Sequence, residues 1–167
     1  MTITKAAREA VRARLAEAFN STMAARAASY SVSPIVIDWT KQLFQGRLMP
    51  DDIVGSTAVD FPIVCLYGVS ARNANLNKFN EFSGTVQLGL DFHFSWPESR
   101  ALSNFDEIAD LTEVTLLGIF HSDTWPAAYT RPLSFNGDIE MQRTPVVMAS
   151  KHWRQTMATR MTFEVDQ

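Results

Sequence analysis

The chain has 167 residues, of which 46% are hydrophobic and 20% charged, with a formal net charge of −3. This length and composition are typical of one globular domain (residues 1–167) with a sizeable core, and the mild negative charge argues against a nucleic-acid binder, which normally carries a basic excess. A single cysteine, Cys65, excludes an internal disulfide and favours a reducing compartment such as a cytoplasm. Without an apolar run of the roughly 20 residues that span a bilayer, we expect no membrane partner.

Residues 4–28 predict the first helix, because they are rich in alanine, the best helix former. Val11, Leu15 and Phe19 recur at helical spacing, so this helix would lie across a sheet with its charges in water. Residues 29–60 follow no regular pattern, and we expect a short strand or one helical turn and then a loop. Residues 61–69 are nearly all apolar, which predicts a strand covered on both faces.

The most regular pattern in the chain covers residues 83–96, where apolar and polar residues alternate. Successive side chains of a strand point to opposite faces, so this segment predicts a long strand with one face in the core. The core-facing set is Val86, Leu88, Leu90, Phe92, Phe94 and Trp96. The preceding residues 70–82 are rich in asparagine and poor in apolar residues, which predicts a long exposed hairpin loop.

A second helix is predicted from Ser103 to Phe120, apolar over more than half of its circumference. Such a helix is usually buried on two sides, here by the first helix or by a neighbouring subunit. Residues 121–137 form a long connection. Residues 139–149 read as a strand that Pro145 interrupts, which indicates an edge strand or a bulge.

A last long strand is predicted at residues 153–165, with Arg154, Arg160 and Glu164 facing water. The elements together predict an α+β fold. We expect an antiparallel or mixed sheet of about four to five strands with two helices packed on one face.

The three histidines, His93, His121 and His152, stand far apart in the sequence. They lack the His-x-x-His or Cys-x-x-Cys spacing of local metal motifs, although strands could bring His93 and His152 together across a sheet. Cys65 lies in the most apolar strand, where a cysteine behaves as a small inert hydrophobe.

The locally clustered carboxylates are those of Asp91 and of Asp106, Glu107 and Asp110 in the second helix. Asp106 and Asp110 share a helix face and so allow a paired acid–base or cation site. Favourable charges at a helix N-terminus explain these residues more simply. Because glycine-rich phosphate loops and Gly-x-Ser-x-Gly elbows are also missing, we expect no enzyme, no cofactor and no metal.

The order of these elements resembles the small tail-terminator and neck (tail-completion) proteins of long-tailed bacteriophages. The resemblance is carried by residues 61–69, the strand 85–96 that ends in Trp-Pro, the helix from Ser103 and the strand 153–165. It is a likeness of pattern and length, since these families have no diagnostic motif. It implies a non-enzymatic virion protein that closes into a ring, most often a hexamer. Such a ring sits at the head-proximal end of the tail tube, ends tube polymerisation and joins tail to head.

The resemblance also implies partners: other copies of this chain, the tail tube protein and the head connector protein. Assembly would occur in the host cytoplasm, and the product would reside in the tail or neck of the virion. A ring needs two different contact surfaces on each subunit. We expect the subunit contact at the second helix and the connection, and the partner-facing surface at the polar loop. The interface residues are Leu111, Val114, Leu117, Trp125 and Tyr129; the loop residues are Arg72, Asn73, Asn75, Asn77 and Lys78.

Other classes of function stay open. A head–tail connector or a minor tail subunit fits the same pattern. A small-ligand binding or enzymatic α+β domain would use a pocket lined by Asp91, His93 and the carboxylates of the second helix. A monomeric adaptor would bind a single host or virion partner through exposed aromatic residues.

Overall fold

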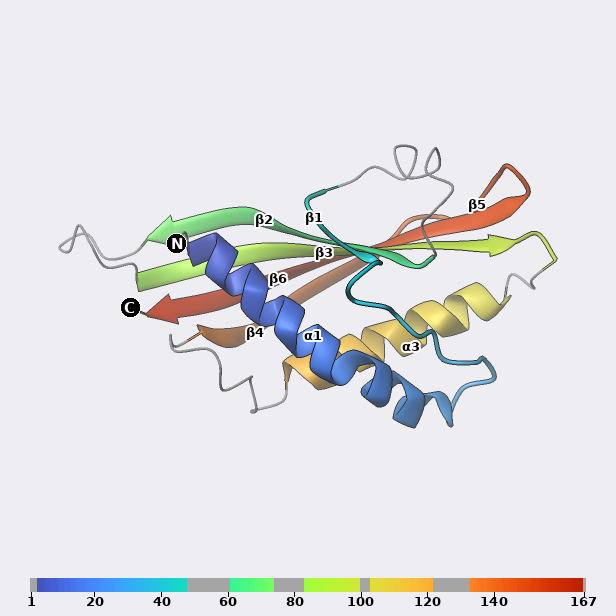
Figure 1. Cartoon of the computed structure of the whole chain (residues 1–167), viewed down its shortest axis with the longest axis horizontal. Helices are drawn as coiled ribbons and strands as arrows, with labels where there is room; N and C mark the ends of the chain where they lie inside the picture. The colour runs from blue at the N-terminus through green and yellow to red at the C-terminus, as the bar shows by residue number, and fades with distance from the viewer. Residues whose placement is uncertain (1–2, 48–60, 74–82, 100–102, 122–132, 167) are drawn as a thin grey trace.

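The computed structural model describes residues 3–47, 61–73, 83–99, 103–121 and 133–166. Two helices lie on one face of a six-stranded mixed sheet (Figure 1). The elements are α1 (Ile3–Ala27), β1 (Leu43–Gln45), β2 (Ile63–Asn73), β3 (Ser83–Pro97), α3 (Ser103–Phe120), β4 (Leu133–Arg143), β5 (Val147–Ala149) and β6 (His152–Asp166). The predicted α+β class with two helices on one face is confirmed. The sheet has slightly more strands than expected, because β1 and β5 are three residues each and too short to leave a periodic pattern.

The strand order is β1-β2-β3-β6-β4, with β5 beside β6. Strand β1 runs parallel to β2, and all the other pairings are antiparallel. At the centre, β3 and β6 pair over their whole length, from Ser83 opposite Asp166 to Pro97 opposite His152. The two strands that the alternating patterns predict therefore form the middle of the sheet.

The hydrophobic core lies between the helices and the sheet. Val86, Leu88, Leu90, Phe92 and Phe94 of β3 are buried as predicted, whereas Trp96 at the strand end is half-buried. Phe19 of α1 stacks on Phe92 with ring centroids 5.7 Å apart and meets Trp39 edge-on at 5.3 Å. Trp39 belongs to the segment without a regular pattern, and this aromatic contact fixes that segment to the core.

Helix α3 is buried on two sides because α1 packs against it as well as against the sheet. Leu111 is fully buried between these layers. Where the helices cross, Arg26 of α1 lies against Gly118 of α3, so a Cβ at Gly118 would collide with the guanidinium. The sequence predicts the first helix or a neighbouring subunit as the second layer against α3, and the structure shows α1 in that place.

Two strands are longer than the sequence pattern predicts. Strand β2 continues to Asn73, so Arg72 and Asn73 belong to a strand and not to the polar loop. Strand β4 begins at Leu133, inside the predicted connection. Both extensions are held by main-chain pairing to β3 or β6, a contribution that side-chain periodicity does not report.

The predicted interruption at Pro145 is confirmed. Strand β4 ends at Arg143 and β5 starts at Val147, and both pair with β6. Between them the Thr144 N–H still donates to the carbonyl of Thr156 at 2.9 Å. Proline cannot donate to the ladder, so the break falls where the edge strand passes from one pairing to the next.

Candidate functional site

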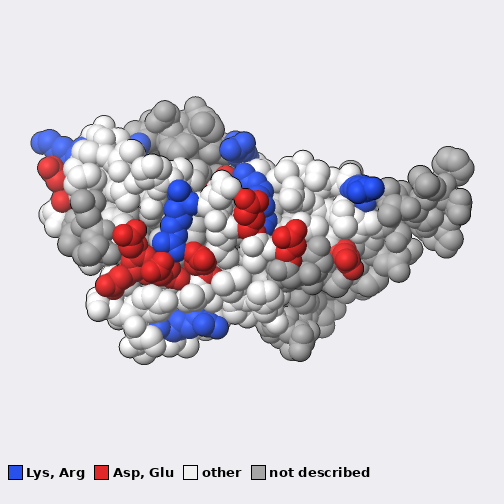
Figure 2. All heavy atoms as spheres, turned by 180° about the vertical axis from the view of Figure 1, so that it is seen from behind, with Lys and Arg blue, Asp and Glu red and all other residues white. Residues whose placement is uncertain are grey.

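The face of the sheet away from the helices carries a row of residues that crosses four strands. Gly89 of β3 pairs with Tyr67 of β2 on one side and with Arg160 of β6 on the other. Arg160 in turn pairs with Glu140 of β4. The rear view in Figure 2 shows interspersed acidic and basic side chains on the described part of this side of the molecule.

The side chains of Tyr67, Asp91 and Arg160 are joined by hydrogen bonds beside the backbone of Gly89. The Tyr67 hydroxyl donates to Asp91 Oδ2 at 2.8 Å, and Arg160 Nη1 donates to Asp91 Oδ1 at 3.0 Å. The Arg160 guanidinium lies 5.3 Å from the centroid of the Tyr67 ring, and that of Arg47 lies 5.8 Å from it. We call Arg47, Tyr67, Asp91 and Arg160 the open-face cluster.

Charge and burial in the open-face cluster favour a structural role. Asp91 is only 4% exposed, and both of its carboxylate oxygens accept a hydrogen bond. Desolvation, followed by the hydrogen bond to Asp91, raises the pKa of Tyr67 to about 12, so its hydroxyl stays protonated at neutral pH. The carboxylate is therefore held as an acceptor for two donors rather than presented to a substrate as a base.

His93 lies on the same face, one position beyond Asp91 in the alternation of β3. It is 5% exposed, and its Nδ1 lies 2.9 Å from the Thr156 hydroxyl oxygen. Its Nε2 is buried and has no hydrogen-bond partner within the part of the chain that the structure describes. Desolvation lowers the pKa of His93 and outweighs the opposing effect of Asp91, so the imidazole is neutral at physiological pH.

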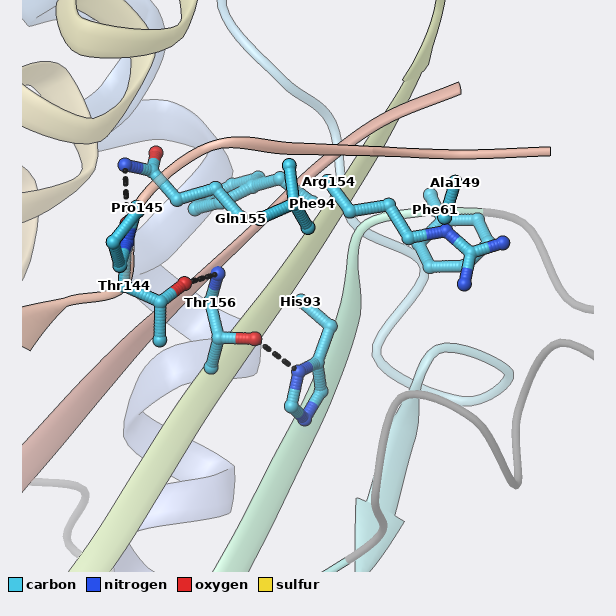
Figure 3. Close-up of a pocket in the computed structure, with 10 residues that line it drawn as sticks. Phe61, His93, Phe94, Thr144, Pro145, Ala149, Arg154, Gln155 and Thr156 are labelled. Atoms are coloured by element: carbon cyan, nitrogen blue, oxygen red, sulfur yellow. Dashed lines mark hydrogen bonds between the residues drawn. The ribbon is translucent and has the colours of Figure 1, made fainter. Parts of the chain in front are cut away.

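A pocket of about 280 Å³ opens beside His93, between β6 and the β4–β5 edge (Figure 3). Figure 3 shows Arg154 reaching toward Phe61, while Gln155 points the other way and donates to the carbonyl of Thr144 at 3.1 Å. The remaining walls are mostly apolar. The lining residues are Phe61, His93, Phe94, Thr144, Pro145, Val147, Ala149, Arg154, Gln155 and Thr156. A pocket of this size and polarity can hold an apolar side chain or a small ligand.

The structure separates His93 from His152 and Asp91 from the carboxylates of α3. His152 pairs with Pro97 at the end of β6, whereas His93 faces Thr156. Asp91 lies on the open face, and the carboxylates of α3 lie on the helix side, where Asp110 and Glu113 both bind Arg143 Nη2 at 2.6 Å. Among the described residues, no three His, Cys, Asp or Glu side chains are grouped so that they could hold a metal ion.

The structure describes five of the ten residues predicted at interfaces, and one of these, Asn73, is the last residue of β2. Leu111 is fully buried and already has its apolar contacts inside the chain, whereas Val114 and Leu117 are half-buried. Arg72 is exposed on β2. Asn75, Asn77, Lys78, Trp125 and Tyr129 lie outside the described residues, so their roles stay predictions.

The open-face cluster was missed by the sequence analysis, which placed Arg160 in water. Arg160 is half-buried because Asp91, on the neighbouring strand, needs a charged partner away from water. The available signal was Gly89, the residue without a side chain in the polar half of the alternation. A Cβ there would lie 2.5 Å from Cζ of Tyr67, so a glycine inside a strand marked the place where an aromatic ring crosses the backbone.

No protein-family model matches this chain, and no curated protein matches it either. Neither helix of the described residues is long and apolar enough to cross a membrane.

Proposed function

We propose that this chain is a structural subunit of a bacteriophage tail, which forms a ring at the head-proximal end of the tail tube and joins tail to head. The observation that supports this most is the architecture. Two helices cover one face of a mixed sheet whose long central strands are β3 and β6, the arrangement that the resemblance to tail-terminator and neck proteins implies. The other face is buried along β2, where Ile63 and Cys65 form a second apolar cluster, and is exposed at Glu140 of β4 and Glu164 of β6.

The chemistry of the open face agrees with a structural role. Tyr67, Asp91 and Arg160 come from three adjacent strands and are bonded to one another, which ties β2, β3 and β6 together. Buried polar networks whose members are satisfied make a structure rigid. A subunit that must present fixed surfaces to several neighbours benefits from such rigidity.

The contact between subunits is proposed at the exposed parts of α3 and at the connection that follows it. Because Leu111 is buried in the core, the contact rests on Val114 and Leu117, together with Trp125 and Tyr129. The predicted polar loop with Asn75, Asn77 and Lys78 would face the tube or the head connector. A head–tail connector or a minor tail subunit would use the same surfaces in another position along the tail.

The first test is the solution mass of the purified chain by light scattering, with negative-stain images of the same fraction. We expect a closed ring, or monomers that become rings when phage tail tubes are added. A monomer that ignores both its own concentration and the tubes would contradict the proposal.

The position of the contact is tested by Leu117→Glu, which places a charge on the half-buried surface of α3. We expect the variant to fold but to lose assembly, because a buried unpaired charge is costly at an interface. Ala16→Glu is the matched control, since Ala16 is exposed on α1 and outside the proposed contact. Equal assembly of both variants would show that the contact lies elsewhere.

A second candidate function, the binding of a small ligand, is favoured by the pocket beside His93. Its walls are largely apolar and the buried Nε2 of His93 offers a polar group. A thermal-shift screen of metabolites and divalent metals tests it, since a ligand that binds only the folded chain raises Tm by an amount that grows with the logarithm of its concentration above Kd. A clear shift that His93→Gln abolishes would favour this function over the structural one.

A further inference from the structure

The sheet leaves two main-chain edges without a partner among the described strands. At one end, β4 is the last strand of the order. At the other end, the three residues of β1 pair only with residues 64–66 of β2. Beyond them, residues 68–72 of β2 are all exposed, including Val69 at 44%. Exposed edges are templates for pairing with another chain.

The two free edges lie at the same level of the sheet. Gly68 pairs with Leu88, Leu88 with Met161, and Met161 with Ile139. At the end of β2, Asn73 pairs with Gly84, Gly84 with Val165, and Val165 with Leu133. Residues 68–73 of β2 and 133–139 of β4 therefore lie at opposite ends of the same rows of paired residues across the sheet. A rotation without axial rise, as in a closed ring, brings one edge beside the other.

The directions of the strands fit such a contact. Strands β2, β3, β6 and β4 alternate in direction, so β4 runs opposite to β2. A rotation about an axis along the strands keeps the direction of β2 in the next copy. Strand β4 of one copy would then meet β2 of the next copy in an antiparallel ladder.

The charges at the two edges are complementary. Asp138 and Glu140 are exposed on β4. At the opposite edge, Arg47 and Arg72 are exposed. Arg47 lies beside β2 because the N–H of the preceding residue, Gly46, donates to the Leu66 carbonyl at 3.2 Å. The transverse row that contains Gly89 thus begins with Tyr67, which Arg47 covers, and ends with Glu140.

We propose that β4 of one copy pairs with residues 68–73 of β2 in the next copy, so that one sheet continues around the ring with Glu140 beside Arg47 of its neighbour. This inference rests on the proposed ring and adds a contact between sheet edges to the contact proposed at α3. The occupant of each free edge is a second copy of this chain. Ring closure would leave neither edge exposed, as it does in a closed barrel.

The test uses two charge reversals, Glu140→Lys and Arg47→Glu, and their 1:1 mixture. Each variant alone places like charges across every contact, so we expect at least about a tenfold rise in the concentration needed for assembly. In the mixture, copies that alternate around a ring of even number pair Lys with Glu at one contact and Glu with Arg at the next. Mixing should therefore restore rings.

Glu164→Lys is the matched control, because Glu164 is exposed on the central strand β6 of the same face and should leave assembly unchanged. Circular dichroism establishes that each variant is folded before assembly is compared. Rings formed equally well by both reversals, or a mixture that does not recover, would overturn the edge pairing while the wild-type ring and the proposed function stand. A wild-type chain that forms no ring with or without tail tubes would overturn both.

Discussion

Gly89 fixes the open-face cluster because its missing side chain lets the Tyr67 ring reach Asp91. We predict that Gly89→Ala destabilises the chain by about 1–3 kcal/mol, since the new Cβ must displace a buried ring bonded to a buried carboxylate. Urea unfolding measures the change. In a Tyr67→Ala background the same substitution should cost much less, because the ring is gone.

Gly118→Ala is a useful comparison, since its Cβ would meet only the end of the flexible Arg26 side chain. There the gain in helix propensity, about 1 kcal/mol, opposes the steric cost. If Gly118→Ala lowers the free energy of unfolding as much as Gly89→Ala does, the atoms that each new Cβ meets do not decide the cost of the substitution.

The buried side chain of His93 should make the stability of the chain depend on pH. Desolvation lowers its pKa below 6.5, so between that lowered pKa and 6.5 the unfolded chain binds more protons than the folded one. Stability then falls as the pH decreases through this window. We predict that the wild type loses more stability than His93→Gln between pH 7.5 and the acid side of the window, measured by urea unfolding at each pH. Parallel profiles for the two chains would contradict this, and His152→Gln, at an exposed residue, controls for the loss of an imidazole.

At the scale of elements, the sequence predicts those segments whose stability comes from a regular apolar pattern. Helices α1 and α3 and strands β3 and β6 lie where the periodicity places them, because burial against one core selects a single period. The ends of β2 and β4 depend on main-chain pairing with β3 and β6, and β1 and β5 are too short for a pattern. Asp91 and Arg160 belong to different strands, so their pairing requires the register of β3 and β6, which no local pattern contains.

The tie between α3 and the end of β4 yields a prediction at the same scale. Arg143 Nη2 donates to Asp110 Oδ1 and to Glu113 Oε2. Desolvation is the largest single effect on the pKa of Arg143 and lowers it, but the hydrogen bonds and charges of the two carboxylates together outweigh it, so the pKa is raised. We predict that Arg143→Met lowers the free energy of unfolding by about 1 kcal/mol, because the site is partly exposed to water and salt.

The effect of Arg143→Met should shrink in 1 M salt, where the Debye length is about 3 Å. Arg12→Met, at an exposed position of α1, is the control and should change stability by less than about 0.5 kcal/mol. A loss at Arg143 that is insensitive to salt would indicate that packing of the arginine stem, and not its charge, joins the helix to the strand.

For the whole molecule, the proposed ring links stability to concentration. A neighbour that binds only the folded chain stabilises it by mass action, so raising the subunit concentration a hundredfold above the assembly threshold adds about 2.7 kcal/mol. In a chain of this size that gain corresponds to a rise in Tm of roughly 5–10 °C. We predict that the Tm of the wild type rises with concentration, measured by scanning calorimetry from the micromolar range upward. The Tm of Glu140→Lys should stay flat over the same range, because its folded copies have like charges at every edge contact. If the wild-type Tm is equally flat, the free edges of β2 and β4 do not hold copies together without a tail tube, and the ring would have to be templated by the tube itself.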